Sequence, residues 1–159
     1  MIINENLSTQ DKIILTAKDV DARFASVFID NLGLVDGETY TFSGNLNLSE
    51  GETSSVILFD SNYKVQSGIS TFSTKERSSF SFTYRDGVTS RIACYAGVHG
   101  STSGISARYT NIKLEKGEEK TLYIPNKNTL ETAKRPYFIG GGYVQRGLSS
   151  RLEGVLYAS

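Results

Sequence analysis

The chain has 159 residues, and 17 Lys and Arg balance 17 Asp and Glu, so that its formal charge at pH 7 is zero. This length suits one domain with a single core, and without a concentrated basic patch we expect no binding to nucleic acid. The apolar runs are only a few residues long, which excludes a membrane-spanning helix, and the first residues lack the pattern of a signal peptide. With one Cys and one His, neither an internal disulfide nor a zinc cluster is expected, and few of the usual enzyme mechanisms remain. We therefore predict a protein that is not an enzyme and that carries no metal or cofactor.

The composition is that of an all-β protein. It is rich in Ser, Thr, Tyr and Phe, with 15 Gly, 2 Pro, 1 Met and no Trp. Thr, Tyr, Phe, Val and Ile favour strands, while Gly, Asn, Asp and Ser favour turns. Long segments with helical spacing are absent.

The first two predicted strands are residues 12–17 and 23–29. In the second of these, alternation places Phe24 and Phe28 on one face and Val27 and Ile29 on the other. A helix over about residues 8–25 is the alternative, because the sequence that begins at Ser8 resembles an N-cap. We favour two strands.

The clearest strand of the chain is residues 40–48, where Tyr40, Phe42, Gly44, Leu46 and Leu48 recur at every second position. Further strands are predicted at residues 54–60, 63–68, 79–84, 91–95 and 107–114, each followed by a turn sequence. The short connections leave no room for crossover helices, so the strands must pair antiparallel. We predict an antiparallel β-sandwich of the jelly-roll type.

The last part of the chain has a different pattern. It contains both prolines and the triple glycine at residues 140–142, and it does not alternate for long. We predict a jelly-roll domain over residues 1–125 and a C-terminal extension over residues 126–159. The extension is expected to pack along the sandwich or against a partner.

Candidate recognition residues surround the Gly- and Ser-rich loop at residues 97–104. Saccharide binding requires aromatic faces and planar polar side chains, and Arg91, Tyr95, His99 and Arg108 combine both types near this loop. Arg91 and Tyr95 share a strand face and should point outward if Ile92 and Cys94 are in the core. Tyr63, which follows an Asp-Ser-Asn turn, is a second candidate. The alternative interpretation is an ordinary solvated face beside a hairpin.

The segment 109–117 has the sequence Tyr-Thr-Asn-Ile-Lys-Leu-Glu-Lys-Gly, and Thr121, Tyr123 and Pro125 follow it. Simple alternation places Tyr109 on one face and Ile112 and Leu114 on the other, with Ile112 and Leu114 in the core and Lys113 pointing out. Gly117 permits the turn that ends the strand. Glu115 should pair with a cation or accept backbone N–H bonds, and Pro125 suits an exit to an extended segment.

This segment resembles the closing motif of carbohydrate-binding-module-like jelly-roll domains in tail, baseplate and other virion proteins of phages, siphophages among them, that infect Gram-positive bacteria. In that family, Ile-x-Leu-Glu-x-Gly leads to a Thr, an aromatic residue and a Pro, and the sequence at residues 37–43 is similar to an early strand of the family. The resemblance covers about residues 20–125. The family often has tryptophans, which this chain lacks, and commonly an Asp where this chain has Asn111, so a structural calcium ion at that position is not implied.

The resemblance implies a virion structural protein, such as a decoration, fibre, collar or baseplate subunit, that aids adsorption to host cell-surface glycans. It implies other virion proteins and host cell-wall polysaccharide as partners, a homo-oligomer, expected as a trimer, and a location on the phage particle. Two alternatives remain open: a structural adaptor without sugar binding, and an accessory domain of a secreted cell-wall hydrolase.

Overall fold

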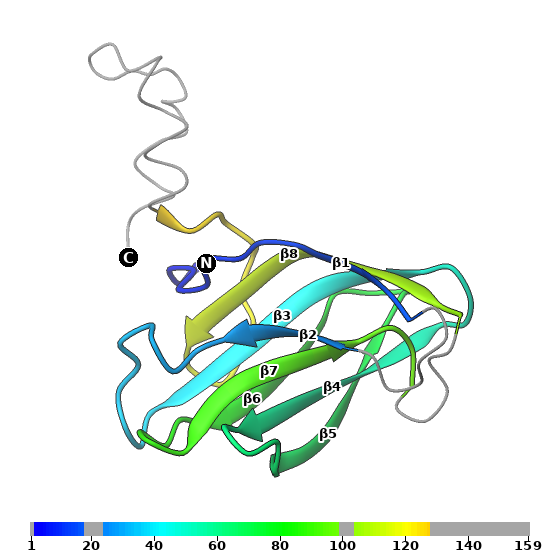
Figure 1. The fold of residues 1–159 in the computed structure, drawn as a ribbon. Coiled ribbons are helices and arrows are strands. Elements are labelled where there is room, and N and C mark those ends of the chain that lie inside the picture. The colour runs from blue at the N-terminus through cyan, green and yellow to red at the C-terminus, as the bar shows by residue number, and fades with distance from the viewer. Residues whose placement is uncertain (1, 18–23, 99–103, 128–159) are drawn as a thin grey trace, which may run out of the picture.

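The structure is a computed structural model that describes residues 2–17, 24–98 and 104–127 of the chain (Figure 1). The described residues form strands β1 (Ile13–Thr16), β2 (Phe24–Phe28), β3 (Thr39–Leu48), β4 (Thr53–Asp60), β5 (Val65–Ser73), β6 (Ser78–Thr83), β7 (Thr89–Tyr95) and β8 (Ser106–Lys116). Among these residues, no helix is long and apolar enough to cross a membrane.

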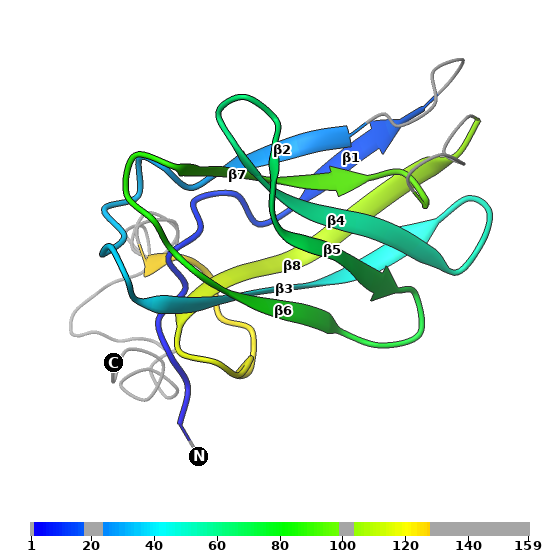
Figure 2. The ribbon, with the colours of Figure 1, turned by 90° about the horizontal axis from the view of Figure 1, so that it is seen from below.

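The strands form two four-stranded sheets that lie face to face (Figure 2). The first sheet has the order β1-β8-β3-β6, and the second sheet has the order β2-β7-β4-β5. All neighbouring strands in both sheets are antiparallel. The chain changes sheet at each connection except the one from β4 to β5, and this gives the strand order of a jelly roll. The predicted fold is therefore confirmed.

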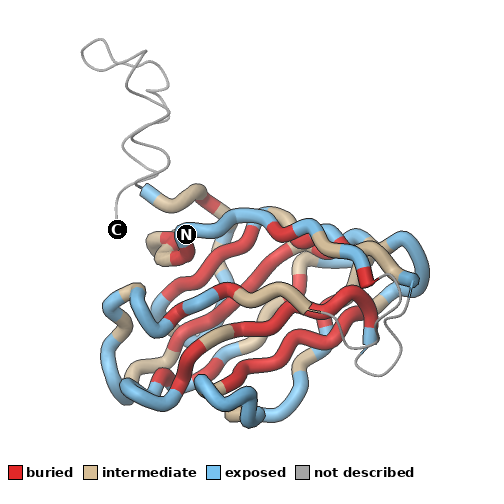
Figure 3. The backbone as a smooth tube through the Cα atoms, in the orientation of Figure 1, coloured by how far each residue is buried: buried red, intermediate tan, exposed pale blue. Residues whose placement is uncertain are grey.

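The core fills the space between the sheets, where the central strands are buried along most of their length (Figure 3). Tyr40, Phe42 and Leu46 of β3 face this space at every second position, as the period of a strand requires. From the other sheet, Val56 and Leu58 of β4 meet them. Further large side chains of this core are Val27, Ile29, Phe72, Phe82, Ile92, Tyr109, Ile112 and Leu114.

The first two strand predictions are confirmed where the structure describes them. β1 pairs with the first part of β8, so that Ile13 lies opposite Tyr109. β2 pairs with β7 along its whole length, and Val27 faces the core while Phe28 is exposed. The alternative helix is wrong at residues 13–16 and 24–25, because the hydrogen bonds of an adjacent strand satisfy their backbone. Residues 18–23 lie outside the described part.

The prediction for β5 is wrong in its bounds. The strand begins at Val65, two residues after the predicted start, and continues to Ser73 instead of ending near Gly68. Between two successive residue pairs of β4 and β5, the register advances by two residues on β4, from Ile57 to Phe59, but by four residues on β5. The additional residues form a bulge, and Gly68 has φ of 82° there. In the sequence, Gly68 indicates the end of a strand, but in the structure it lies within the irregular part of one strand.

The predicted alternation is also wrong at the centre of β8. It places Tyr109 on the face opposite Ile112 and Leu114, whereas all three side chains lie in the core. Asn111 has φ of 52°, and near it the pairing advances three residues along β8 but only two along β3. One extra residue reverses the face of every later side chain, so a β-bulge reconciles both parts of the strand with one core.

Polar contacts from the neighbouring strands hold this bulge. The guanidinium of Arg77 donates to the carbonyl oxygen of Asn111 at 2.8 Å and to Oγ of Ser43 at 2.9 Å. Gly44 lies opposite the bulge, where an added Cβ would approach the carbonyl oxygen of Thr110 to 3.4 Å. Gly44 of β3 and the guanidinium of Arg77, from the β5–β6 connection, thus lie directly against the bulge.

The closing motif stabilises the fold as predicted at most of its positions. Ile112 and Leu114 are buried in the core. Gly117 has φ of 110°, a conformation that favours glycine, at the turn that ends β8. Pro125 follows the last strand and lies in no ladder.

Lys113 is a correction to the sequence prediction. It points to the outer face of the first sheet, but the segment after Gly117 covers that face, and the side chain is 0% exposed. Its Nζ donates to the carbonyl oxygen of Leu122 at 2.6 Å and to Oγ1 of Thr121 at 2.8 Å. It also lies 3.6 Å from Oε1 of Glu115, which is equally buried. Glu115 accepts from the backbone N of Thr121 at 3.0 Å, so both predicted partners of this carboxylate, a cation and an N–H group, are present.

The N-terminal segment adds to the same side of the sandwich. The backbone N of Leu7 donates to the carbonyl oxygen of Leu114, and the N of Ile112 donates to the carbonyl oxygen of Asp11. The Asn6 side chain donates to the carbonyl oxygens of Ile112 and Ile124. Residues 6–11 therefore extend the edge of the first sheet beyond β1. Most of the predicted extension 126–159 lies outside the described residues, and the boundary after residue 125 stays a prediction.

Tyr109 should make the fold sensitive to alkaline pH. Its hydroxyl donates to the carbonyl oxygen of Tyr95 at 2.7 Å, and burial raises its pKa above the ordinary value. A tyrosine whose pKa is higher in the folded state contributes stability that is complete below its unfolded pKa of about 10 and is lost as pH rises beyond it. We expect Tyr109→Phe to cost about 1 kcal/mol at pH 7 and to make the decline above pH 10 shallower.

Urea unfolding at pH 7 and at steps to pH 11 measures both effects. Some alkaline decline should remain in the variant, because burial also raises the pKa of Tyr84 and Tyr95. An identical decline in wild type and Tyr109→Phe would contradict this account.

Candidate functional site

The outward face of the second sheet has an aromatic surface. The strand register places Phe28, Arg91, Phe59 and Val65 in one row across β2, β7, β4 and β5. Phe28 and Val65 are 48% and 47% exposed. A row of this kind brings side chains from four strands onto one surface, although they are far apart in the sequence.

Beneath the exposed rings lies a second apolar cluster, separate from the main core. It consists of Ile57, Phe59, Ala93 and Tyr95, and Phe24 packs against it. The ring centroid of Phe24 lies 5.1 Å from that of Tyr95 and 5.9 Å from that of Phe59. Tilted rings at these distances attract one another beyond the gain from burial. The cluster therefore gives the outer face a packed, largely aromatic base.

Tyr63 projects from the β4–β5 turn onto this base. Its ring centroid lies 5.8 Å from that of Phe59 and 6.1 Å from that of Phe24, yet Tyr63 remains 54% exposed. Its φ is 62°, a left-handed conformation that costs a residue other than glycine about 1 to 2 kcal/mol. The Asp60 carboxylate holds the turn by accepting from the backbone N of Asn62 at 2.8 Å and of Lys64 at 2.9 Å. Strained residues cluster at functional sites, so Tyr63 is a candidate binding residue.

Arg91 lies between the two exposed rings. Its Cζ is 4.6 Å from the ring centroid of Tyr63 and 4.9 Å from that of Phe28. Nη1 donates to the Tyr63 hydroxyl at 2.7 Å, and Nε donates to Oγ of Ser90 at 3.3 Å. These contacts fix a planar donor group within an aromatic surface. We call Phe28, Tyr63 and Arg91 the aromatic platform.

The sequence candidates are brought together only in part. Arg91 and Tyr63 form the platform, and Tyr95 lies on the same face, but Tyr95 is only 2% exposed and supports the exposed rings from below. Arg108 lies in the first sheet, paired with Ile14 and Asn47, and is separate from this surface. His99 lies outside the described residues.

Phe24, Phe28 and Phe59 belong to the surface, and the sequence interpretation did not select them. A signal for two of them was present, since the alternation in residues 24–28 places Phe24 and Phe28 on one face. For Phe59, the signal was hidden, because residues 56–59 are all apolar and both faces of β4 are buried.

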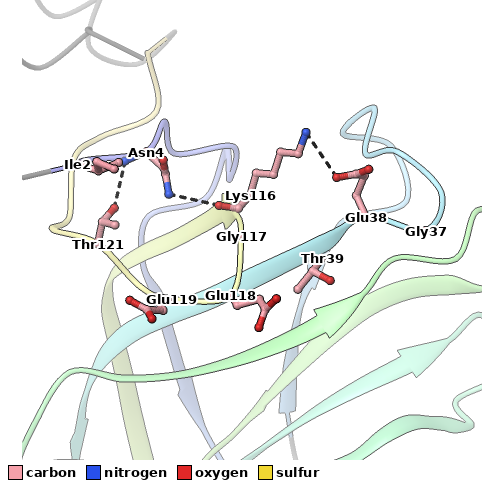
Figure 4. Close-up of a pocket in the computed structure, with 10 residues that line it drawn as sticks. All are labelled: Ile2, Asn4, Gly37, Glu38, Thr39, Lys116, Gly117, Glu118, Glu119 and Thr121. Atoms are coloured by element: carbon pink, nitrogen blue, oxygen red, sulfur yellow. Dashed lines mark hydrogen bonds and ion pairs between the residues drawn. The ribbon is translucent and has the colours of Figure 1, made fainter.

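A separate hollow of about 640 Å³ lies at the end of the first sheet, between the N-terminal segment, the turn before β3 and the segment after β8 (Figure 4). Charged and polar side chains line most of it. Lys116 reaches across to Glu38, with Nζ 3.4 Å from Oε1, while Glu118 and Glu119 lie on its opposite side. None of the described residues that line it is aromatic, so these residues offer charged and polar groups and no stacking surface.

The described residues contain no group of three or more His, Cys, Asp and Glu side chains that could hold a metal ion. Cys94 is buried in the main core, and burial raises the pKa of its thiol, so that it stays protonated near neutral pH. What the aromatic surface offers to a ligand is stacking on its rings and hydrogen bonds from its polar groups.

No protein-family model and no curated protein matches the chain. Among solved structures, the N-terminal cellulose-binding domain from Cellulomonas fimi β-1,4-glucanase C is similar with a TM-score of 0.43 and 14% identity, and the match covers 69% of this chain and 81% of that one. The CBM22-1 xylan-binding domain from Paenibacillus barcinonensis Xyn10C is similar with a TM-score of 0.42 and 12% identity, over 75% of this chain and 99% of that one. These values establish neither a family nor a ligand for this chain.

Proposed function

We propose that the protein is a non-catalytic domain that binds saccharides on the outward face of its second sheet. The observation that supports this function is the aromatic platform, in which Arg91 is held between the exposed rings of Phe28 and Tyr63. Sugar rings have apolar C–H faces that stack on aromatic rings, and their hydroxyl groups need polar partners in fixed positions. The platform offers both, and the cluster beneath it holds the rings in place.

The proposed function is tested by exposing the protein to immobilised glycans and to Gram-positive cell walls. For this assay, four copies of the protein are displayed together, because several weak sites that act at once bind more strongly than one site. We expect retention of the wild type and at least about tenfold weaker binding by Phe28→Ala. Ile14→Ala is the control, because Ile14 is a large, 65% exposed apolar residue of the first sheet.

Failure of every glycan and cell wall to retain the displayed protein would contradict saccharide binding and favour the structural adaptor. Cleavage of cell-wall polysaccharide by the pure protein would contradict the non-catalytic assignment and favour the hydrolase alternative.

We further propose that the protein is a phage virion component that assists adsorption to the host, with other virion proteins as partners. This placement is supported by the sequence of the closing motif, from Ile112 to Gly117 and on to Pro125. Antibodies against the protein should label intact phage particles in electron micrographs. Their failure to label, with no peptide of the chain in purified particles, would contradict the placement.

A homotrimer is expected to form through the C-terminal extension. Size exclusion with light scattering should give three times 17.4 kDa for the whole chain and a single-chain mass for a chain that ends at Asn126. A monomeric whole chain, unchanged by the truncation, would contradict an assembly role for residues 127–159.

A further inference from the structure

Arg91 introduces a positive charge into a surface that is otherwise aromatic. Nε and Nη1 each make one hydrogen bond, to Ser90 and Tyr63. A guanidinium group has five N–H donors, so three of them have no partner among the residues described. The side chain is half-buried, and its planar edge is therefore available to a ligand that lies on the two rings.

Arg91 belongs to none of the ion pairs of the described residues. No carboxylate of the described residues lies within ion-pair distance of it; their ion pairs join Lys75 to Glu52, Lys113 to Glu115 and Lys116 to Glu38. Asp30 approaches only through Ser90, whose hydroxyl donates to the Asp30 carboxylate at 3.0 Å. Asp60, at the end of β4, is occupied with the backbone of its own turn.

We propose that the aromatic platform prefers saccharides that carry an oxyanion, either the carboxylate of a uronic acid or a phosphate ester. The sugar ring would stack on Phe28 and Tyr63 while the oxyanion accepts hydrogen bonds from the free edge of Arg91. Guanidinium groups suit this task because their N–H groups match the two oxygens of a carboxylate or phosphate. This inference rests on the proposed saccharide binding.

Calorimetric titration compares two matched pairs of probes. The first pair is oligogalacturonate and its methyl ester, and the second is glycerol-phosphate polymer with glucosyl substituents and the corresponding neutral glucoside. We expect the charged member of at least one pair to bind about tenfold more tightly at low salt, as one charge-assisted hydrogen-bond pair would give. The pair that shows the difference identifies the source of the oxyanion. The difference should shrink at high salt.

Arg91→Gln should abolish the difference in affinity between the charged and neutral members of a pair, and because Arg91 belongs to the platform it should also weaken binding of the neutral probes. Arg108→Gln is the matched control, because it removes the same charge from the first sheet and should change nothing. If Arg91→Gln fails to fold, Arg91→Lys replaces it. That variant keeps the charge but loses the planar donor edge, so the preference should fall without vanishing.

Equal affinity for the charged and neutral members of both pairs would overturn this inference and leave saccharide binding intact. The inference is overturned in the same way if the wild type binds neutral glycans in the screen and neither charged probe. Binding to no glycan at all would refute the proposed function itself.

Discussion

Replacing Lys113 by methionine should destabilise the protein by about 3 to 5 kcal/mol, the usual cost of removing one member of a buried ion pair. Lys113 and Glu115 are both 0% exposed, and burial lowers the pKa of Lys113 while Glu115 acts to raise it. Without the ammonium group, the carboxylate stays buried beside Thr121 with one fewer partner. The segment that covers the outer face of the first sheet would also lose the bond from Lys113 to the carbonyl oxygen of Leu122.

Urea unfolding at pH 7 measures this loss. The double variant Lys113→Met/Glu115→Gln should lose less than the sum of the two single variants, because it leaves no unpaired charge in the interior. A control at a surface pair, Lys75→Met, should change stability by less than about 1 kcal/mol, since Lys75 and Glu52 are mostly exposed. A loss at Lys113 no larger than at Lys75 would contradict the buried position of the pair.

Tyr63→Gly should weaken saccharide binding at least about tenfold while changing stability little. The substitution removes the exposed ring and the partner of Arg91, so the platform loses half of its stacking surface. Glycine adopts the left-handed conformation of this turn freely, and the relief of strain offsets the lost contacts with Phe24 and Phe59 to within about 1 kcal/mol.

Tyr63→Phe is the companion variant. It keeps the ring and removes only the hydroxyl that accepts from Arg91 Nη1, so an intermediate affinity is expected. Calorimetric titration and urea unfolding of the same preparations separate binding from folding. A Tyr63→Gly variant that binds as the wild type does would show that the tyrosine is only a turn residue.

The sequence was sufficient to predict the class of fold, because most of its strands have apolar residues at every second position and are separated by turn sequences. The strand at residues 40–48 shows this well: its core face was predicted residue by residue. The errors in strand bounds and alternation arose at bulges, where additional residues interrupt the period. At Asn111 a bulge reverses the alternation, and a lone positive φ leaves no trace in a hydrophobic pattern.

The position of Lys113 was not predictable for a different reason. Its burial depends on residues 118–124 folding back over the sheet, which is a tertiary contact without a local signal. The candidate site was predictable in part: Arg91, Tyr63 and Tyr95 were selected by residue type, but only the register between β2 and β7 places Arg91 beside Phe28. Tyr63 is exposed whereas Tyr95 is buried, and this difference also depends on packing. In the sequence, both are simply tyrosines near turns.

The most direct test of the central claim is an NMR titration of the isotopically labelled protein with the oligosaccharide that binds best in the screen. We expect the largest shift changes at Phe28, Tyr63 and Arg91 and at their neighbours on the outward face of the second sheet, saturating with a single dissociation constant. Changes confined to Glu38, Lys116 and the other residues of the hollow at the first sheet, or no saturable change at all, would contradict saccharide binding by the aromatic platform.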